Sequence, residues 1–229
     1  MKYEFYWPVL WKYRDLLLEG LWITLFLFVV GATCALVLGV IFGTMGTSRS
    51  RALRIVSEVY VEVNRNTPLV VKLFFLYFGF GLEAYHAALI GLAIHQSAYM
   101  AEIVRAGIDS IAVGQMEAGL SSGLKRIQVM RRIILPQGLA IVIPPMTTQV
   151  LETLKNSSIA MTIAIPELTF QTQQIEAYSF RGFEAATAAT GMYLALGFLV
   201  AGLSVWLESR LGARRFRIRA LQPDLVAAT

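Results

Sequence analysis

The segment Gln115–Pro136 reads QMEAGLSSGLKRIQVMRRIILP and lies between two long apolar blocks. Small residues fill its first half, and the second half carries the cations Lys125, Arg126, Arg131 and Arg132. In a membrane protein, short loops rich in lysine and arginine lie on the cytoplasmic side, so we expect this segment there. The small side chains would let another protein approach the backbone, with Glu117 as a fixed charge beside them. From composition alone the alternative is an ordinary solvated loop, because runs of like charge are usually solvated.

The composition of the chain indicates an integral membrane protein. Of its 229 residues, 56% are hydrophobic and 15% are charged, and the mean hydropathy is +0.60. Soluble domains carry about 25% charged residues, and a helix needs about 20 apolar residues to cross a bilayer. The net charge of +5 comes from basic residues in short loops, which is a sign of membrane topology and not of nucleic-acid binding. Cys34 is the only cysteine of the sequence, which excludes an intrachain disulfide and a paired-cysteine metal site.

The apolar runs predict an all-α integral membrane protein with five transmembrane helices. The predicted crossings are residues 20–43, 55–82, 86–106, 133–166 and 185–207. Because basic clusters follow the first, third and fifth crossings, we expect the N-terminus outside and the C-terminal tail in the cytoplasm. We divide the chain into an aromatic interfacial segment (residues 1–19), one transmembrane domain (20–211) and a basic cytoplasmic tail (212–229). Residues 167–184 are expected to form the longest external loop.

Side chains within the crossings predict how the helices pack. Small residues recur at helical spacing in the first crossing: Gly31, Ala32, Ala35, Gly39 and Gly43. Because small residues four apart let helices approach closely, we expect this face to pack on protein and not on lipid. Glu102 and Arg105 are spaced i, i+3 in the third crossing and are expected to pair. Lys72 lies in an aromatic run and either faces a polar interior or snorkels to the interface.

Polar residues interrupt the second and fourth crossings and mark a candidate transport path. The path residues are Arg65, Asn66, Thr67, Pro68, Ser97, Thr148, Glu152, Lys155, Asn156, Ser157 and Ser158. Broken helices at membrane depth offer backbone donors and helix ends to a polar solute. The alternative is a broken helix whose polar groups satisfy one another, with Glu152 and Lys155 as an i, i+3 pair.

The sequence carries no motif of enzymatic chemistry. The Walker A loop GxxxxGK[ST], the GxSxG elbow and the HExxH helix are all absent. We therefore expect that the chain is not an enzyme, that it holds no cofactor or metal, and that the energy for transport comes from another protein.

The polar segment resembles the EAA motif of ABC importer permeases. The match consists of Glu117-Ala118-Gly119, then Gly123, then Ile133-x-Leu135-Pro136, with Gly119 where the family usually has a second alanine. The resemblance implies a cytoplasmic coupling helix, between the third and fourth crossings, that docks in a cleft of an ATPase subunit. The implied docking residues are Gln115, Glu117, Ala118, Gly119, Ser122, Gly123 and Lys125.

The wider sequence, residues 21–211, is similar to permeases of the polar amino-acid uptake group. The matching stretches are RNTPLVVKLFFLYFG, SAYMAEIVRAGIDSI and PPMTTQVLETLKNSSIAMTIAIPEL, the last being most like the glutamate/aspartate branch. The resemblance implies five crossings with the N-terminus outside, in a bacterial inner membrane. It also implies a second permease subunit, identical or related, two ATPase subunits that hold ATP and Mg²⁺, and a periplasmic substrate-binding protein.

The function expected from this resemblance is uptake of a polar amino acid, with an acidic one favoured. Lys155 or Arg65 would hold an anionic group, and Glu152 or Asn156 an ammonium. Permeases for glutamine or for a cationic amino acid are alternatives within the same family. An ion-gradient-driven secondary transporter is a further alternative, although such proteins usually show inverted repeats, which this sequence does not. A non-transporting membrane scaffold would need no polar residues in the fourth crossing.

Overall fold

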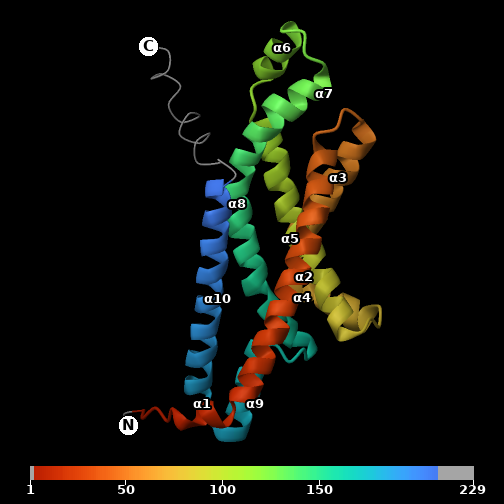
Figure 1. Cartoon of the computed structure of the whole chain (residues 1–229). Coiled ribbons are helices and arrows are strands. Elements are labelled where there is room, and N and C mark those ends of the chain that lie inside the picture. The colour runs from red at the N-terminus through yellow and green to blue at the C-terminus, as the bar shows by residue number, and fades with distance from the viewer. Residues whose placement is uncertain (1–2, 211–229) are drawn as a thin grey trace.

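The computed structural model describes residues 3–210, and every regular element within that range is a helix (Figure 1). In chain order these are α1 (Pro8–Lys12), α2 (Arg14–Gly46), α3 (Arg51–Arg65), α4 (Leu69–Phe74), the π-turn η1 (Phe75–Gly79), α5 (Ala84–Asp109), α6 (Val113–Ser121), α7 (Arg126–Val129), the π-turn η2 (Met130–Ile134), α8 (Leu135–Asn156), the 3₁₀ segment η3 (Ser157–Ile163), α9 (Leu168–Ser179) and α10 (Gly182–Arg210). The all-α class is confirmed for this part of the chain, and the predicted tail, 212–229, lies outside it.

Among the described residues, four helical stretches are long and apolar enough to cross a membrane. They are Arg14–Gly46, Ala84–Asp109, Arg126–Ile163 and Gly182–Leu207, which correspond to the first, third, fourth and fifth predicted crossings. The segment predicted as the second crossing is instead divided into α3, α4 and η1, and only Leu69–Gly79 is an apolar helix. The division falls at Pro68, which lacks an amide donor and disfavours helical geometry in the residue before it.

The close packing predicted for the first crossing is confirmed between α2 and α5. A Cβ atom added to Gly31 would lie 2.6 Å from the side chain of Leu92, and one added to Gly39 would lie 2.6 Å from the side chain of Met100. Further along the same face, Gly43 meets Val104 in the same way. The missing side chains therefore let α5 approach the backbone of α2 along most of its length, which makes this helix pair the central support of the bundle.

The region predicted as the longest external loop, residues 167–184, lies between two candidate membrane spans and is for the most part a helix, while its position outside the membrane stays a prediction. Leu168 and Ile175 of α9 are fully buried and pack on Val9, Leu17 and other apolar residues of the N-terminal segment and α10. These two residues are seven positions apart, which places them on one face of a helix. The segment is helical because this face and a capped first turn outweigh its otherwise polar composition.

The two ends of the bundle are formed by short helices. The corner between α6 and α7 forms one end, and α1 and α9 form the other (Figure 1). At the second end α2 begins at Arg14, so the last residues of the predicted interfacial segment already belong to the first long helix. The aromatic residues before it are largely exposed, including Trp7 and Trp11. The boundaries proposed for the domains remain predictions.

Candidate functional site

The α6–α7 corner (residues 113–129) is held by its own backbone. The Leu124 amide donates to the Gly119 carbonyl (3.2 Å) and the Gly123 amide to that of Leu120 (3.0 Å), while Gly123 has a φ of +80°. These are the two bonds and the left-handed glycine of a Schellman motif, which ends a helix sharply. The Lys125 amide then donates to Oε1 of Gln128 (2.8 Å) and begins α7. The corner is therefore a fixed bend and not a loose loop.

Gly119 packs inside this corner. It is buried, and an added Cβ atom would lie 2.7 and 2.8 Å from the two methyl carbons of Val129 and 3.3 Å from Cδ1 of Ile133. The other predicted docking residues are exposed: Gln115, Glu117, Ala118, Ser122, Gly123 and Lys125. Gly119 therefore faces α7 and lies away from the surface that these residues form. The family resemblance gave no information on which face of α6 each residue occupies.

Exposed apolar residues extend the same corner, and the sequence analysis missed them. Val113 is 74% exposed, Leu120 43% and Ile127 64%. Val113 and Leu120 are seven positions apart and so share one face of α6. Contact with water does not stabilise apolar side chains. The seven-residue spacing of Val113 and Leu120 was the signal in the sequence that could have identified them.

The polar residues of the predicted path fall into separate groups, of which the first lies at the break between α3 and α4. Asn66 donates to the Glu62 carbonyl (2.8 Å) and Thr67 to the Val63 carbonyl (2.8 Å), so both satisfy the end of α3. Arg65 lies over the ring of Tyr99, 5.5 Å from its centroid. The hydroxyl of Ser97, on α5, is 2.6 Å from that of Tyr60. Each of these four side chains therefore has a partner on α3 or α5.

Lys72 crosses this break from the α4 side. Its ammonium donates to the Asn64 carbonyl at 2.6 Å and lies 3.1 Å from Nδ1 of His95. It therefore binds the carbonyl end of α3, where a cation is favoured. Of the two expectations for Lys72, the structure agrees with a polar interior partner.

The second group of path residues lies around the end of α8, and its members point in different directions. Lys155 and Glu152 form an ion pair (2.7 Å), as the alternative interpretation predicts. Asn156 and Ser157 border a very small cavity against α2, α4 and α5. Thr148 is exposed on α8. Of the eleven predicted residues, only Lys155 and Ser158 line the larger cavity described next.

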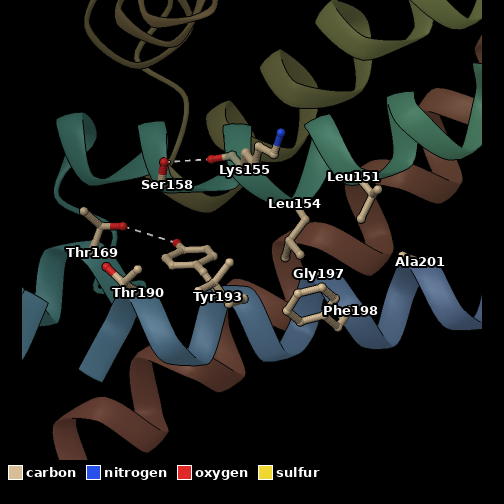
Figure 2. Close-up of a pocket in the computed structure, with 11 residues that line it drawn as sticks. Leu151, Leu154, Lys155, Ser158, Thr169, Thr190, Tyr193, Gly197, Phe198 and Ala201 are labelled. Atoms are coloured by element: carbon tan, nitrogen blue, oxygen red, sulfur yellow. Dashed lines mark hydrogen bonds between the residues drawn. The ribbon is translucent and has the colours of Figure 1, made fainter. Parts of the chain in front are cut away.

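A cavity of about 500 Å³ lies between α8, α9 and α10. Most of its wall is apolar and is formed by Leu151, Leu154, Leu194, Phe198 and Ala201. The polar side chains are at the end near α9 and are Lys155, Ser158, Thr169, Thr190 and Tyr193. Figure 2 shows this division, with Thr169 and Tyr193 toward one end and Ala201 toward the other. The cavity thus combines an apolar body with a polar end, the usual character of a small-molecule site.

A buried carboxylate lies directly behind the polar end. Glu167 is fully buried and accepts the backbone amides of Thr169 (2.9 Å) and Phe170 (2.8 Å), which caps α9. It also accepts the hydroxyl of Tyr193 (2.8 Å), whose oxygen is 3.2 Å from that of Thr169. Burial raises the pKa of the Glu167 carboxyl, and the surrounding donors oppose this rise. The sequence analysis placed residue 167 only at the start of an expected loop, although a carboxylate just before an apolar residue is a cap signal.

A second buried carboxylate fastens the N-terminal segment to this end. Glu184, at the start of α10, accepts the hydroxyl of Tyr3 (2.5 Å) and the backbone amide of Tyr6 (2.8 Å). Arg181 contacts the same carboxylate at 3.4 Å and donates to the Glu4 carbonyl at 3.0 Å. The N-terminal segment, α9 and α10 are therefore joined by side-chain bonds.

Comparisons with known proteins agree with this architecture. The family described as binding-protein-dependent transport system inner membrane component matches residues 35–213. The chain is 35% identical to a probable amino-acid ABC transporter permease protein of Vibrio harveyi, covering 89% of this chain and 92% of that one. It is 34% identical to the glutamine transport system permease protein of Escherichia coli (strain K12), covering 91% and 98%. The structure of an amino acid ABC transporter with histidines superposes with a TM-score of 0.82 at 32% identity, covering 92% of this chain and all of that one.

Proposed function

We propose that this chain, which belongs to the family of binding-protein-dependent transport system inner membrane components, is the membrane-spanning subunit through which an ATP-driven importer moves a polar amino acid. The observation that carries the proposal is the fold match over nearly the whole chain, together with an exposed α6–α7 corner at one end of the bundle. Permeases of this family are not enzymes, and a separate subunit hydrolyses ATP. Membership also implies an ATPase and a substrate-binding protein as partners.

The topology that we propose has five crossings in a bacterial inner membrane, with the N-terminus outside. The four long helices provide four of the crossings, and α3 with α4 and η1 provides an interrupted fifth. The cations of the α6–α7 corner support a cytoplasmic position for that end. The α1–α9 end then faces the substrate-binding protein. A second permease subunit, identical or related, is part of the same proposal.

The ATPase is proposed to dock on the exposed face of the α6–α7 corner. Glu117 forms no ion pair with any described residue and so is free to meet a partner. ATP and Mg²⁺ would be bound by that partner. Because Gly119 seats α6 on Val129, a displacement of α6 moves α7, and α7 continues through η2 into α8. Since α8 forms one wall of the cavity, a movement of the docked corner would also move the wall of the substrate path.

The substrate that we propose for the cavity is a polar amino acid with no net side-chain charge, such as glutamine. An acidic substrate carries two carboxylates, but the polar end has a single cation, Lys155, which also pairs with Glu152. The glutamine permease among the relatives supports the same choice. At the α3–α4 break, Asn66 and Thr67 are bonded to the end of α3 and Arg65 lies over Tyr99 of α5, so these residues contribute less to this proposal.

Reconstitution with the partner subunits tests the function. The chain is co-expressed with its ATPase, placed in liposomes with the binding protein, and supplied with labelled glutamine, glutamate or arginine. We expect uptake that needs ATP inside the liposome and the binding protein outside, with glutamine taken up best. Uptake driven by a proton or sodium gradient without ATP would contradict the proposal and favour a secondary transporter.

A further inference from the structure

We propose that the polar end of the cavity binds the α-ammonium group of the transported amino acid, because the protein fixes the protons of three hydroxyls there. This inference rests on the function proposed above. It assigns a recognition role to Ser158, Thr169 and Tyr193 and a positioning role to Glu167. None of Glu167, Thr169 and Tyr193 stood out in the sequence.

The direction of the hydrogen bonds follows from the buried carboxylate. Both carboxyl oxygens of Glu167 accept backbone amides, so the Tyr193 hydroxyl is the donor in its 2.8 Å bond to Glu167. The two amides that cap α9 hold the carboxylate in this acceptor role. With its proton used, Tyr193 can only accept, so the proton of Thr169 lies in the 3.2 Å contact with Tyr193 or in a bond to Glu167, and in both cases Thr169 donates to the protein. Figure 2 shows this contact.

Ser158 is fixed in the same way from the other side of the cavity. Its hydroxyl donates to the backbone carbonyl of Lys155 at 2.7 Å, a bond also visible in Figure 2. The hydroxyls of Ser158, Thr169 and Tyr193 have therefore given their protons to the protein, and each of the three offers a ligand only its oxygen lone pairs. These three fixed acceptors suit an ammonium, which offers three N–H donors, while the ammonium of Lys155 and the hydroxyl of Thr190 are the groups at the same end that can donate.

The charges around these hydroxyls orient the ligand. Glu167 places a carboxylate behind the hydroxyl wall, and bonds from a charged donor are about twice as strong as neutral ones. Lys155 lines the same end, where its ammonium is held by Glu152 at 2.7 Å and remains 68% exposed. Lys155 is therefore placed to meet the carboxylate of an amino acid whose ammonium lies at Tyr193. The apolar wall of Leu194 and Phe198 remains for the rest of the molecule.

A binding experiment with a matched pair of ligands tests this assignment. The permease–ATPase complex in nanodiscs is titrated calorimetrically with L-glutamine and with glutaramate, which is the same molecule without the ammonium. We expect the wild type to bind L-glutamine about tenfold more tightly or better, the size of one charge-assisted hydrogen bond. In Tyr193→Phe and in Ser158→Ala, affinity for L-glutamine should fall and the ratio between the two ligands should shrink.

Glu167→Gln provides the more specific test. The glutamine amide can donate to Tyr193, which would turn the phenol proton toward the cavity and make it a donor. We expect this variant to lose the preference for L-glutamine while still binding glutaramate. If Glu167→Gln does not assemble with the ATPase, Tyr193→Phe and Ser158→Ala carry the test, because both changes are nearly isosteric.

Thr172→Val is the matched control. Thr172 also lies on α9, but its hydroxyl donates to its own helix at Leu168 and does not line the cavity. The ligand ratio should be unchanged in this variant. Equal wild-type affinity for the two ligands, or a full ratio retained in Tyr193→Phe, would overturn the assignment and leave the transport function intact. A wild-type complex that binds neither L-glutamine nor L-glutamate would contradict the proposed function as well.

Discussion

Each end of the bundle is stabilised by a different kind of contact. In the α6–α7 corner the decisive contact is a missing side chain, Gly119 against Val129, and the bend is closed by backbone bonds. At the other end two buried carboxylates, Glu167 and Glu184, bind backbone amides and tyrosine hydroxyls from distant segments. We call this second region, residues 3–13 and 167–193, the α9 cap.

The difference indicates how each end takes part in transport. In the α9 cap, buried side-chain bonds join the N-terminal segment, α9 and α10, so this end is expected to move as one body. In the corner Gly119 packs on the buried Val129, while the charged side chains and the apolar side chains of Val113, Leu120 and Ile127 are exposed. The corner is therefore a rigid part with a free surface, suited to receive force from another protein. The following predictions test this contrast, from the largest expected effect to the smallest.

Glu167→Ala should destabilise the α9 cap most. The change removes a helix cap, worth about 1 kcal/mol, and leaves the Tyr193 hydroxyl without its acceptor, which costs about 2 kcal/mol more. We expect a loss of about 3 kcal/mol in the free energy of unfolding in mixed micelles. Glu176→Ala, an exposed carboxylate on the same helix, is the control and should change little. Similar losses in both variants would show that the buried carboxylate has no special role.

Gly119→Val should have the second-largest effect, which falls on the α6–α7 corner. The added side chain would enter space already filled by Val129, and overpacking of this kind costs about 2 kcal/mol. We expect the protein to insert normally, while ATP-driven uptake falls because α6 no longer sits in register on α7. Immunoblots of membranes and uptake by proteoliposomes measure the two effects separately.

A rescue experiment starts from the smaller change Gly119→Ala, which should also lower uptake. Val129→Ala should restore uptake in that variant, because it removes the methyl groups that the new Cβ atom meets. Gly114→Ala, where an added Cβ atom meets nothing within 4 Å, is the matched glycine control and should be neutral. If Val129→Ala gives no rescue, the contact between α6 and α7 does not transmit the movement.

Gly123→Ala should have a smaller effect of about 1 kcal/mol. Its φ of +80° is unfavourable for a residue with a Cβ atom, although the space around it is open. The cost is therefore backbone strain and not a clash, and Gly123→Asn should recover part of it because asparagine tolerates this conformation. Equal stability of all three proteins would show that the bend does not depend on the glycine.

Lys155→Gln should have the smallest effect on stability. An ion pair as exposed as Lys155–Glu152 contributes about 0.5 kcal/mol or less, and salt screens it. Affinity for the substrate should nevertheless fall, because Lys155 lines the cavity. Thermal unfolding and ligand titration of the same variant separate the two. A large loss of stability would instead make Lys155 a structural residue.

Local patterns in the sequence predicted much of the fold. The glycine face of α2 and the pair of Glu102 and Arg105, 2.5 Å apart, depend on residues within one or two helical turns, and both are present. The break at Pro68 follows from the chemistry of proline alone. Hydropathy also located the four long helices, but it did not show that α3 is too polar on one face to form a continuous crossing.

The candidate site was less predictable because its contacts are distant in sequence. Glu167 and Tyr193 are 26 positions apart, and Glu184 and Tyr3 are 181 apart, so no local pattern could pair them. The polar residues of α8 were located correctly as a group, but their directions depend on where the helix ends and η3 begins. Gly119 was selected for its small size, and only the fold shows which neighbour requires it.

The central claim is that the exposed face of the α6–α7 corner lies in the cytoplasm and is covered by an ATPase. Single cysteines are placed by Ser122→Cys in the corner and Tyr178→Cys in the α9 cap, with Cys34→Ala in both, and a membrane-impermeant maleimide is applied to sealed vesicles. We predict that the corner cysteine reacts only in inside-out vesicles and is protected when the ATPase is bound, while the cap cysteine reacts only in right-side-out vesicles. A corner cysteine that reacts from the outside, or that the bound ATPase leaves fully reactive, would contradict the account.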